Sequence, residues 1–174
     1  MVLIFTEIAE GAIKKSSLEA IYYGSKVAEM MGSTAIALSI GKADSSELAK
    51  AGNFGVPKVL HANDSKLDAA NSMAYATVLV AAVKSVGATV IITAKSSLAD
   101  AVTARAAGAL KAAVVGNVTD LPTISGVFKV KRSIFTGKAF AEVSVNSAIK
   151  VLAIKKNAVA PIESSNTASV ENFN

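Results

Sequence analysis

Five polar residues stand at the ends of strands that the sequence predicts. They are Thr6, Ser39, Lys95, Ser96 and Ser97. In open α/β sheets, ligands bind at the carboxyl ends of the strands, so these residues would border one crevice. Hydroxyl and ammonium groups in such a place could contact the phosphates of a nucleotide.

The same residues also have a structural interpretation. Ser97 and Asp100 have the spacing of a capping box, in which the serine accepts from early amides and the acid lies in the positive first turn. A helix start that carries its own acceptor competes with an external anion. The first loop, TEIAEGAIKKSS, lacks GxGxxG, and no GxxxxGK[ST] occurs. The sequence therefore favours capping serines and a solvated Lys95 over a phosphate site.

Catalysis and metal binding have little support. The chain has no cysteine and a single histidine, His61, and its acids form no close pair suited to acid–base work. His61 ends a predicted strand and is expected at the surface or the edge of the core. Arg105 falls in the middle of a helix, where it could pair with a carboxylate or face another chain. We expect no catalytic residue, no metal ligand and no enzymatic activity from this chain alone.

Strands alternate with helices over the first two thirds of the sequence. The predicted strands are Val2–Thr6, Thr34–Ile40, Lys58–His61 and Thr89–Thr93, and residues 7–15 form a polar loop. Each predicted helix starts with a hydroxyl or carboxylate residue and has an acid three positions later: Ser16/Glu19, Asp44/Glu47, Ser65/Asp68 and Ser97/Asp100. The first three helices are expected to stop at Gly32, at Gly52 or Gly55, and at Gly87. This alternation predicts a three-layer, doubly wound, mostly parallel sheet with helices on both faces.

The pattern changes after Lys111. Ala113–Val115 is predicted as a fifth parallel strand. Three short strands then follow, at residues 127–134, 139–145 and 149–154, and their short connections predict antiparallel pairing. From Asn157 the chain turns polar and reads as a linker or tail. We therefore expect one α/β domain over residues 1–156 and a linker over residues 157–174.

Charge and hydropathy limit the partners. The net charge is +5 and the pI about 9.4, but the lysines are scattered and no aromatic platform alternates with arginine, so nucleic acid is not expected. No apolar run is long enough to span a membrane, and no secretory signal precedes the first strand. With no cysteine, this composition fits a cytoplasmic protein. Four basic residues gather on the expected hairpins, either as a solvated edge or as an interface for an acidic partner. They are Lys129, Lys131, Arg132 and Lys138.

Several segments, in order, resemble the N-terminal domain of electron transfer flavoprotein alpha subunits. They are VLIFTE with SSLEAIYYGSKVAE, AKSSLADAVTARAAGAL, GNVTDL, RSIFTGKAFAEV and IKKNAVAP. The resemblance covers nearly all of residues 2–161. It implies a Rossmann-like fold of the adenine nucleotide alpha hydrolase type. Lys95 departs from the small residues usual in that family's loop.

The resemblance also implies a function. The full protein would carry electrons from flavin dehydrogenases, such as acyl-CoA dehydrogenases, to a quinone oxidoreductase, in the cytoplasm of a bacterium. Its FAD would sit mainly in a C-terminal domain that is absent here, and a beta subunit would complete the heterodimer. This domain would then be structural, with no FAD-binding residue assigned to it. The alternative is a stand-alone adenine-nucleotide-binding α/β domain.

Overall fold

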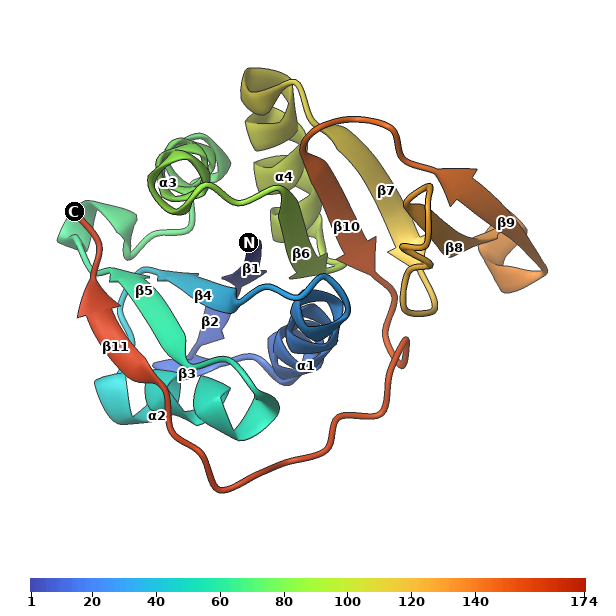
Figure 1. The fold of residues 1–174 in the computed structure, drawn as a ribbon. Coiled ribbons are helices and arrows are strands. Elements are labelled where there is room, and N and C mark those ends of the chain that lie inside the picture. Colours follow the sequence, from blue (N-terminus) through green and yellow to red (C-terminus); the bar gives the residue numbers. More distant parts are fainter.

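The computed structural model describes residues 1–174 and is organised around one nine-stranded sheet (Figure 1). The strand order is β11-β5-β4-β1-β6-β10-β7-β8-β9. Seven strands are parallel: β1 (Val2–Thr6), β4 (Ala35–Ile40), β5 (Lys58–Ala62), β6 (Val90–Ala94), β7 (Ala113–Val118), β10 (Lys150–Ile154) and β11 (Ser169–Asn172). An antiparallel pair, β8 (Lys129–Ile134) and β9 (Ala139–Ser144), extends one side. The predicted α/β architecture is confirmed.

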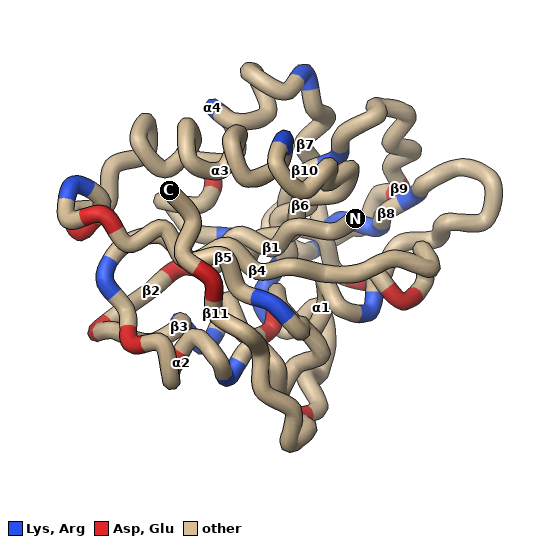
Figure 2. Tube along the Cα trace, turned by 60° about the vertical axis from the view of Figure 1, so that its left-hand side comes forward, with Lys and Arg blue, Asp and Glu red and all other residues tan.

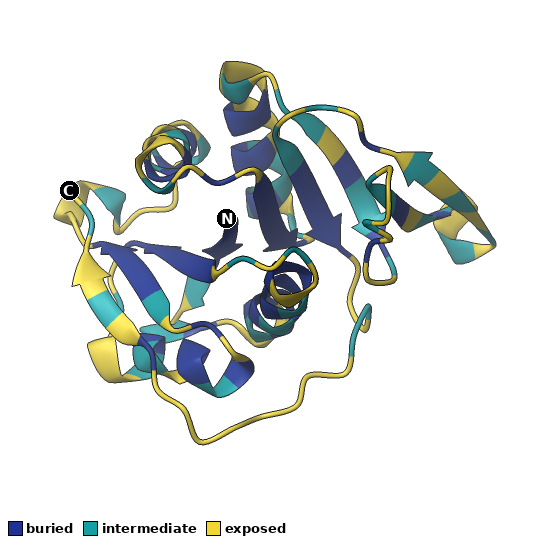
Figure 3. Ribbon diagram, in the orientation of Figure 1, coloured by how far each residue is buried: buried dark blue, intermediate teal, exposed yellow.

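The central strands are buried on both faces, as Figure 3 shows. In β1, Val2 and Ile4 face one core cluster and Leu3 and Phe5 face the other. Side chains alternate between the faces of a strand, so a strand covered on both sides must be apolar throughout. This explains why VLIFT is a continuous apolar run rather than an alternating one.

Helices cover both faces of the sheet (Figure 1). On one face lie α1 (Lys15–Met30) and the short α2 (Ser45–Ala49), which continues as the 3-10 helix η1 (Lys50–Phe54). On the other face lie α3 (Ser72–Val86) and α4 (Ser97–Leu110). Two further 3-10 turns are η2 (Ser65–Leu67) and η3 (Phe135–Gly137). The three layers match the prediction.

The predicted helix starts were less accurate than the helices themselves. α1 begins at Lys15, after Lys14, and no side chain caps it, so the expected Ser16/Glu19 box is wrong. Ser65 belongs to η2, and α3 starts seven residues later, where the Asn71 carboxamide accepts from the amides of Met73 and Ala74. Asp44 holds the cap position of α2 without a side-chain bond. All three expected glycine stops are confirmed, because Gly32, Gly55 and Gly87 follow the ends of their helices with positive φ.

The strand β10 corrects the prediction for the region after Lys111. β8 and β9 pair antiparallel as expected. β10, however, is parallel, and it lies in the middle of the sheet between β6 and β7. After the β8–β9 hairpin at the edge of the sheet, the chain therefore returns to the middle of the sheet and lies between two earlier strands.

The C-terminal residues are also more ordered than a tail. Residues 155–168 run beneath α1 and η1 as an irregular strap and lead into β11, which pairs with the edge of β5 (Figure 1). The amide of Ala168 donates to the carbonyl of Ala49, and Lys58 forms an ion pair with Glu171 at 2.8 Å. The expectation that residues 157–174 form no folded element is therefore wrong for their last part.

Candidate functional site

The order of the strands reverses between β1 and β6. From β1 the chain proceeds outward through β4 to β5, and then returns to place β6 on the other side of β1. The loops that follow β1 and β6 meet at this point, at the carboxyl edge of the sheet. In doubly wound folds this switch point is the usual ligand position.

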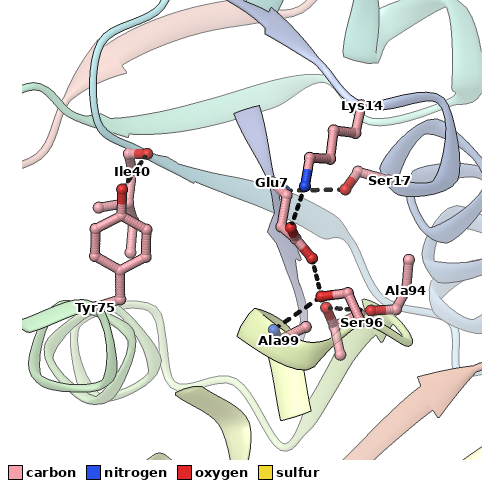
Figure 4. A network of polar contacts seen from close by, with 9 residues as sticks. Glu7, Lys14, Ser17, Ile40, Tyr75, Ala94, Ser96 and Ala99 are labelled. Atoms are coloured by element: carbon pink, nitrogen blue, oxygen red, sulfur yellow. Dashed lines mark hydrogen bonds and ion pairs between the residues drawn. The ribbon is translucent and has the colours of Figure 1, made fainter. Parts of the chain in front are cut away.

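Glu7 occupies the switch point. It directly follows β1, only 5% of its surface is exposed, and its carboxylate reaches across to the loop after β6 (Figure 4). One carboxylate oxygen accepts from the Ser96 hydroxyl, and the other accepts from the Lys14 ammonium at 2.7 Å. The backbone amide of Glu7 donates to the Ser17 hydroxyl at 2.9 Å. The carboxylate thus joins the two loops and satisfies its buried charge with two donors.

A small hairpin positions Lys14. The strands β2 (Ile8–Ala9) and β3 (Ala12–Ile13) pair antiparallel around Glu10 and Gly11, which both have positive φ. Two-residue hairpin turns of the primed type need positive φ at the central position or positions. The hairpin returns Lys14 to Glu7, and the Lys14 amide donates to the Glu7 carbonyl at 2.9 Å.

Sequence reasoning treated residues 7–15 as a polar loop and so missed Lys14. The signal was the Glu10-Gly11 pair between two short apolar pairs, which suits a tight hairpin. Glu7 follows Thr6 directly in the chain, and its bond to Ser96 brings the loops after β1 and β6 together.

Thr6 and Ser39 lie side by side in adjacent strands but are closed to solvent. Their exposed fractions are 1% and 0%, and their hydroxyl oxygens are 2.6 Å apart. Thr6 also bonds with the Leu38 carbonyl at 3.0 Å. These hydroxyls stabilise the pairing of β1 and β4 and present no free donor to a ligand.

The loop after β6 separates its three candidate residues. Ser96, not Ser97, caps α4: its hydroxyl accepts from the Ala99 amide at 3.0 Å while it donates to Glu7. Ser97 is an exposed first-turn residue, so the Ser97/Asp100 capping box is wrong by one position. Lys95 is exposed and forms an ion pair with Asp100 at 2.6 Å. At the start of α4, the Ala99 amide therefore finds its hydrogen-bond acceptor, the Ser96 hydroxyl, within the chain.

The remaining polar candidates form no second site. His61 is 2% exposed, and its Nε2 lies 2.8 Å from the Gly41 carbonyl, which places it in the core. Arg105 is exposed on α4. No group of three or more acidic or imidazole side chains lies close enough together to hold a metal ion.

The β8–β9 hairpin, residues 129–144, is the second polar feature, and we call it the basic hairpin. It carries four basic side chains against one acidic one, Glu142 (Figure 2). Lys129 pairs with Glu142 at 3.1 Å, Lys131 lies 4.8 Å from the centre of the Phe140 ring, and Arg132 forms no ion pair within the chain. β9 is the last strand of the sheet, so its outer backbone groups have no strand partner.

The tip of the basic hairpin is strained and apolar. Phe135 and Thr136 both have positive φ, at 47° and 55°, in a region that residues other than glycine seldom adopt. Phe135 is 75% exposed and Phe140 is 56% exposed. The strained tip thus places a large aromatic side chain in solvent.

The sheet topology and the polar loops at its switch point define a Rossmann-like α/β domain. Its switch point is occupied by its own side chains and does not suit the pyrophosphate of a dinucleotide such as FAD. The Glu7 carboxylate would repel that group, and the α4 start already has its acceptor. None of the helices has both the length and the apolar character needed to cross a bilayer.

A family model described as the electron transfer flavoprotein domain matches residues 2–174. The chain therefore belongs to the electron transfer flavoprotein family. A comparison with curated proteins found no match.

Proposed function

We propose that this chain is the N-terminal domain of the alpha subunit of an electron transfer flavoprotein. In this proposal the assembled protein takes electrons from flavin dehydrogenases, such as acyl-CoA dehydrogenases, and passes them to a quinone oxidoreductase. The chain itself is a structural part that forms the heterodimer with a beta subunit. FAD belongs to a C-terminal alpha domain and to the beta subunit, and the proposed location is the bacterial cytoplasm.

The family match over residues 2–174 is the observation that carries the proposal. Two features of the site agree with it. The switch point is occupied by the Glu7 carboxylate, which suits a domain whose cofactor lies elsewhere. The basic hairpin offers a free strand edge and exposed aromatic side chains, which suit a partner subunit.

Flavin content tests the proposal. The chain purified alone should be colourless, and a flavin absorption spectrum should appear only when it is joined to the C-terminal alpha domain and co-expressed with the beta subunit. A yellow preparation of the isolated chain, with one flavin per chain, would contradict it. Failure of the chain to co-purify with the beta subunit would also contradict it.

The basic hairpin is proposed as the surface that the partner subunit covers. Its excess of positive charge favours an acidic patch on the partner, and an added strand at the edge of β9 would satisfy the free backbone groups. Burial of Phe135 and Phe140 would supply apolar contact area.

The alternative function is a stand-alone adenine-nucleotide-binding domain. Calorimetry with AMP and ATP separates the two functions. Saturable binding that is lost when Ser96 and Ser97 are both changed to alanine would favour the alternative. The Ser96 hydroxyl already accepts a hydrogen bond at the start of α4, which argues against nucleotide binding there.

A further inference from the structure

We infer that the switch point holds an anion-binding cradle, made by Lys14 and Ser96, in which the chain's own Glu7 carboxylate is the resident anion. The cradle would accept a phosphate group if Glu7 were absent. This inference concerns the chain's own chemistry and does not depend on the flavoprotein proposal.

The donors of the cradle come from two separate elements. Lys14 follows the β2–β3 hairpin, and Ser96 precedes α4, yet both donate to one carboxylate (Figure 4). A lysine ammonium and a serine hydroxyl are common phosphate donors. Their convergence on a single buried anion makes this arrangement more than a helix cap.

The hydrogen-bond direction at Ser96 is set by α4. Its oxygen already accepts from the Ala99 amide at 3.0 Å, so its single proton is available to an acceptor at the position of the Glu7 carboxylate. The positive end of the helix favours negative charge in that position. An anion at the Glu7 position therefore receives support from Ser96, from Lys14 and from the helix.

Glu7 excludes other anions in two ways. Its charge repels a phosphate. Its side chain, which is only 5% exposed, lies between the two donors. As a tethered ligand it has a high effective concentration at the donors, so we expect external phosphate to compete poorly with it.

Removal of the carboxylate tests the inference. Inorganic phosphate is titrated calorimetrically into the wild type, Glu7→Ala and Glu10→Ala; the last removes an equal charge from the exposed tip of the β2–β3 hairpin. We expect Glu7→Ala to bind one phosphate at least about tenfold more tightly than the wild type or Glu10→Ala. The double variant Glu7→Ala/Lys14→Ala should lose this gain.

Thermal unfolding keeps the test decisive if Glu7→Ala is unstable. Phosphate, compared with chloride at equal ionic strength, should raise the melting temperature of Glu7→Ala more than that of Glu10→Ala. The reason is that a ligand that binds the folded state stabilises the folded state. Equal phosphate affinity in the wild type and Glu7→Ala would overturn the inference. So would a Glu7→Ala variant that phosphate neither binds nor stabilises.

Discussion

Gly52 lies directly against the backbone of Ala168, the residue that leads into β11. A methyl group on Gly52 would lie 2.4 Å from the Ala168 amide nitrogen and 2.3 Å from the carbonyl carbon of Thr167. Such distances are not possible between a carbon atom and backbone. The absence of a side chain at Gly52 is therefore what allows the C-terminal strap to cross η1.

Gly52→Ala should release the strap and β11. We expect a loss of about 1–3 kcal/mol in the free energy of unfolding, since backbone atoms must shift to admit the methyl group. Limited proteolysis should cut residues 155–168 faster than in the wild type. The control is Gly108→Ala in α4, where a methyl group meets nothing within 4 Å and should stabilise by up to about 1 kcal/mol. A Gly52→Ala protein as stable and as resistant as the wild type would contradict this packing.

Ser96→Ala and Ser97→Ala should differ, although the residues are adjacent. Ser96→Ala removes the cap of α4 and one donor to the buried Glu7, so we expect a cost of about 2 kcal/mol. Ser97→Ala should change stability by less than about 0.5 kcal/mol, because its side chain is exposed. Urea unfolding of both variants measures the difference. Equal effects would show that Ser96 is not the cap.

Tyr23 should make stability depend on pH in alkaline solution. Burial, together with the nearby charge of Asp120, raises the pKa of Tyr23 well above its usual value, and its hydroxyl donates to the Asp120 carbonyl at 2.8 Å. Above about pH 10 the unfolded state loses this proton while the folded state keeps it, so the free energy of unfolding falls as pH rises. Tyr23 alone contributes a slope of up to about 1.4 kcal/mol per pH unit.

Tyr23→Phe isolates that contribution. The variant should be less stable by about 1 kcal/mol at neutral pH, because the Asp120 carbonyl loses its donor. Its unfolding free energy should then fall less steeply than that of the wild type above about pH 10. Parallel curves for the two proteins across this range would be inconsistent with a buried, protonated Tyr23.

The basic hairpin should be needed for partner binding and not for folding. Phe135→Ala should weaken binding of the beta subunit by about tenfold or more, since exposed aromatic residues often dominate interfaces. Its melting temperature should stay close to that of the wild type, because Phe135 is 75% exposed. Met73→Ala, on the exposed face of α3, is the matched apolar control. Surface plasmon resonance with immobilised beta subunit measures both variants.

Charge reversal tests the same surface independently. Lys131→Glu with Lys138→Glu should slow association and reduce its dependence on salt, as expected for an acidic partner. Lys84→Glu with Lys111→Glu applies the same charge change outside the hairpin and should leave the association rate nearly unchanged. Equal effects from the two pairs would indicate general charge steering rather than a hairpin interface.

The sequence predicted the strands and the layer order well, because these depend on local composition. Runs such as VLIFT and VIITA are apolar and β-branched, and they are buried on both faces as expected. The helix starts were harder to predict. A serine with an acid three residues later recurs by chance, while the true cap of α3 is Asn71, which lacks that pattern.

The position of β10 and the Glu7 site could not be predicted locally. Nothing in KVLAI distinguishes an antiparallel strand from a parallel one inserted between β6 and β7, since the pairing is decided by residues far away in the chain. The contact between the loops after β1 and β6 agrees with the expectation that the polar residues at these strand ends lie close together. The donor that completes it, Lys14, depends on a hairpin turn that was read as a loop.

The insertion of β10 also determines when the two halves of the sheet can join during synthesis. Until residues 150–154 leave the ribosome, β6 and β7 each lack a neighbour, and two unpaired edges remain inside the sheet. Assembly must then wait for a distant segment, which slows folding and exposes a nascent chain to aggregation. A fragment that ends before Lys150 would lack the strand that joins the two halves of the sheet.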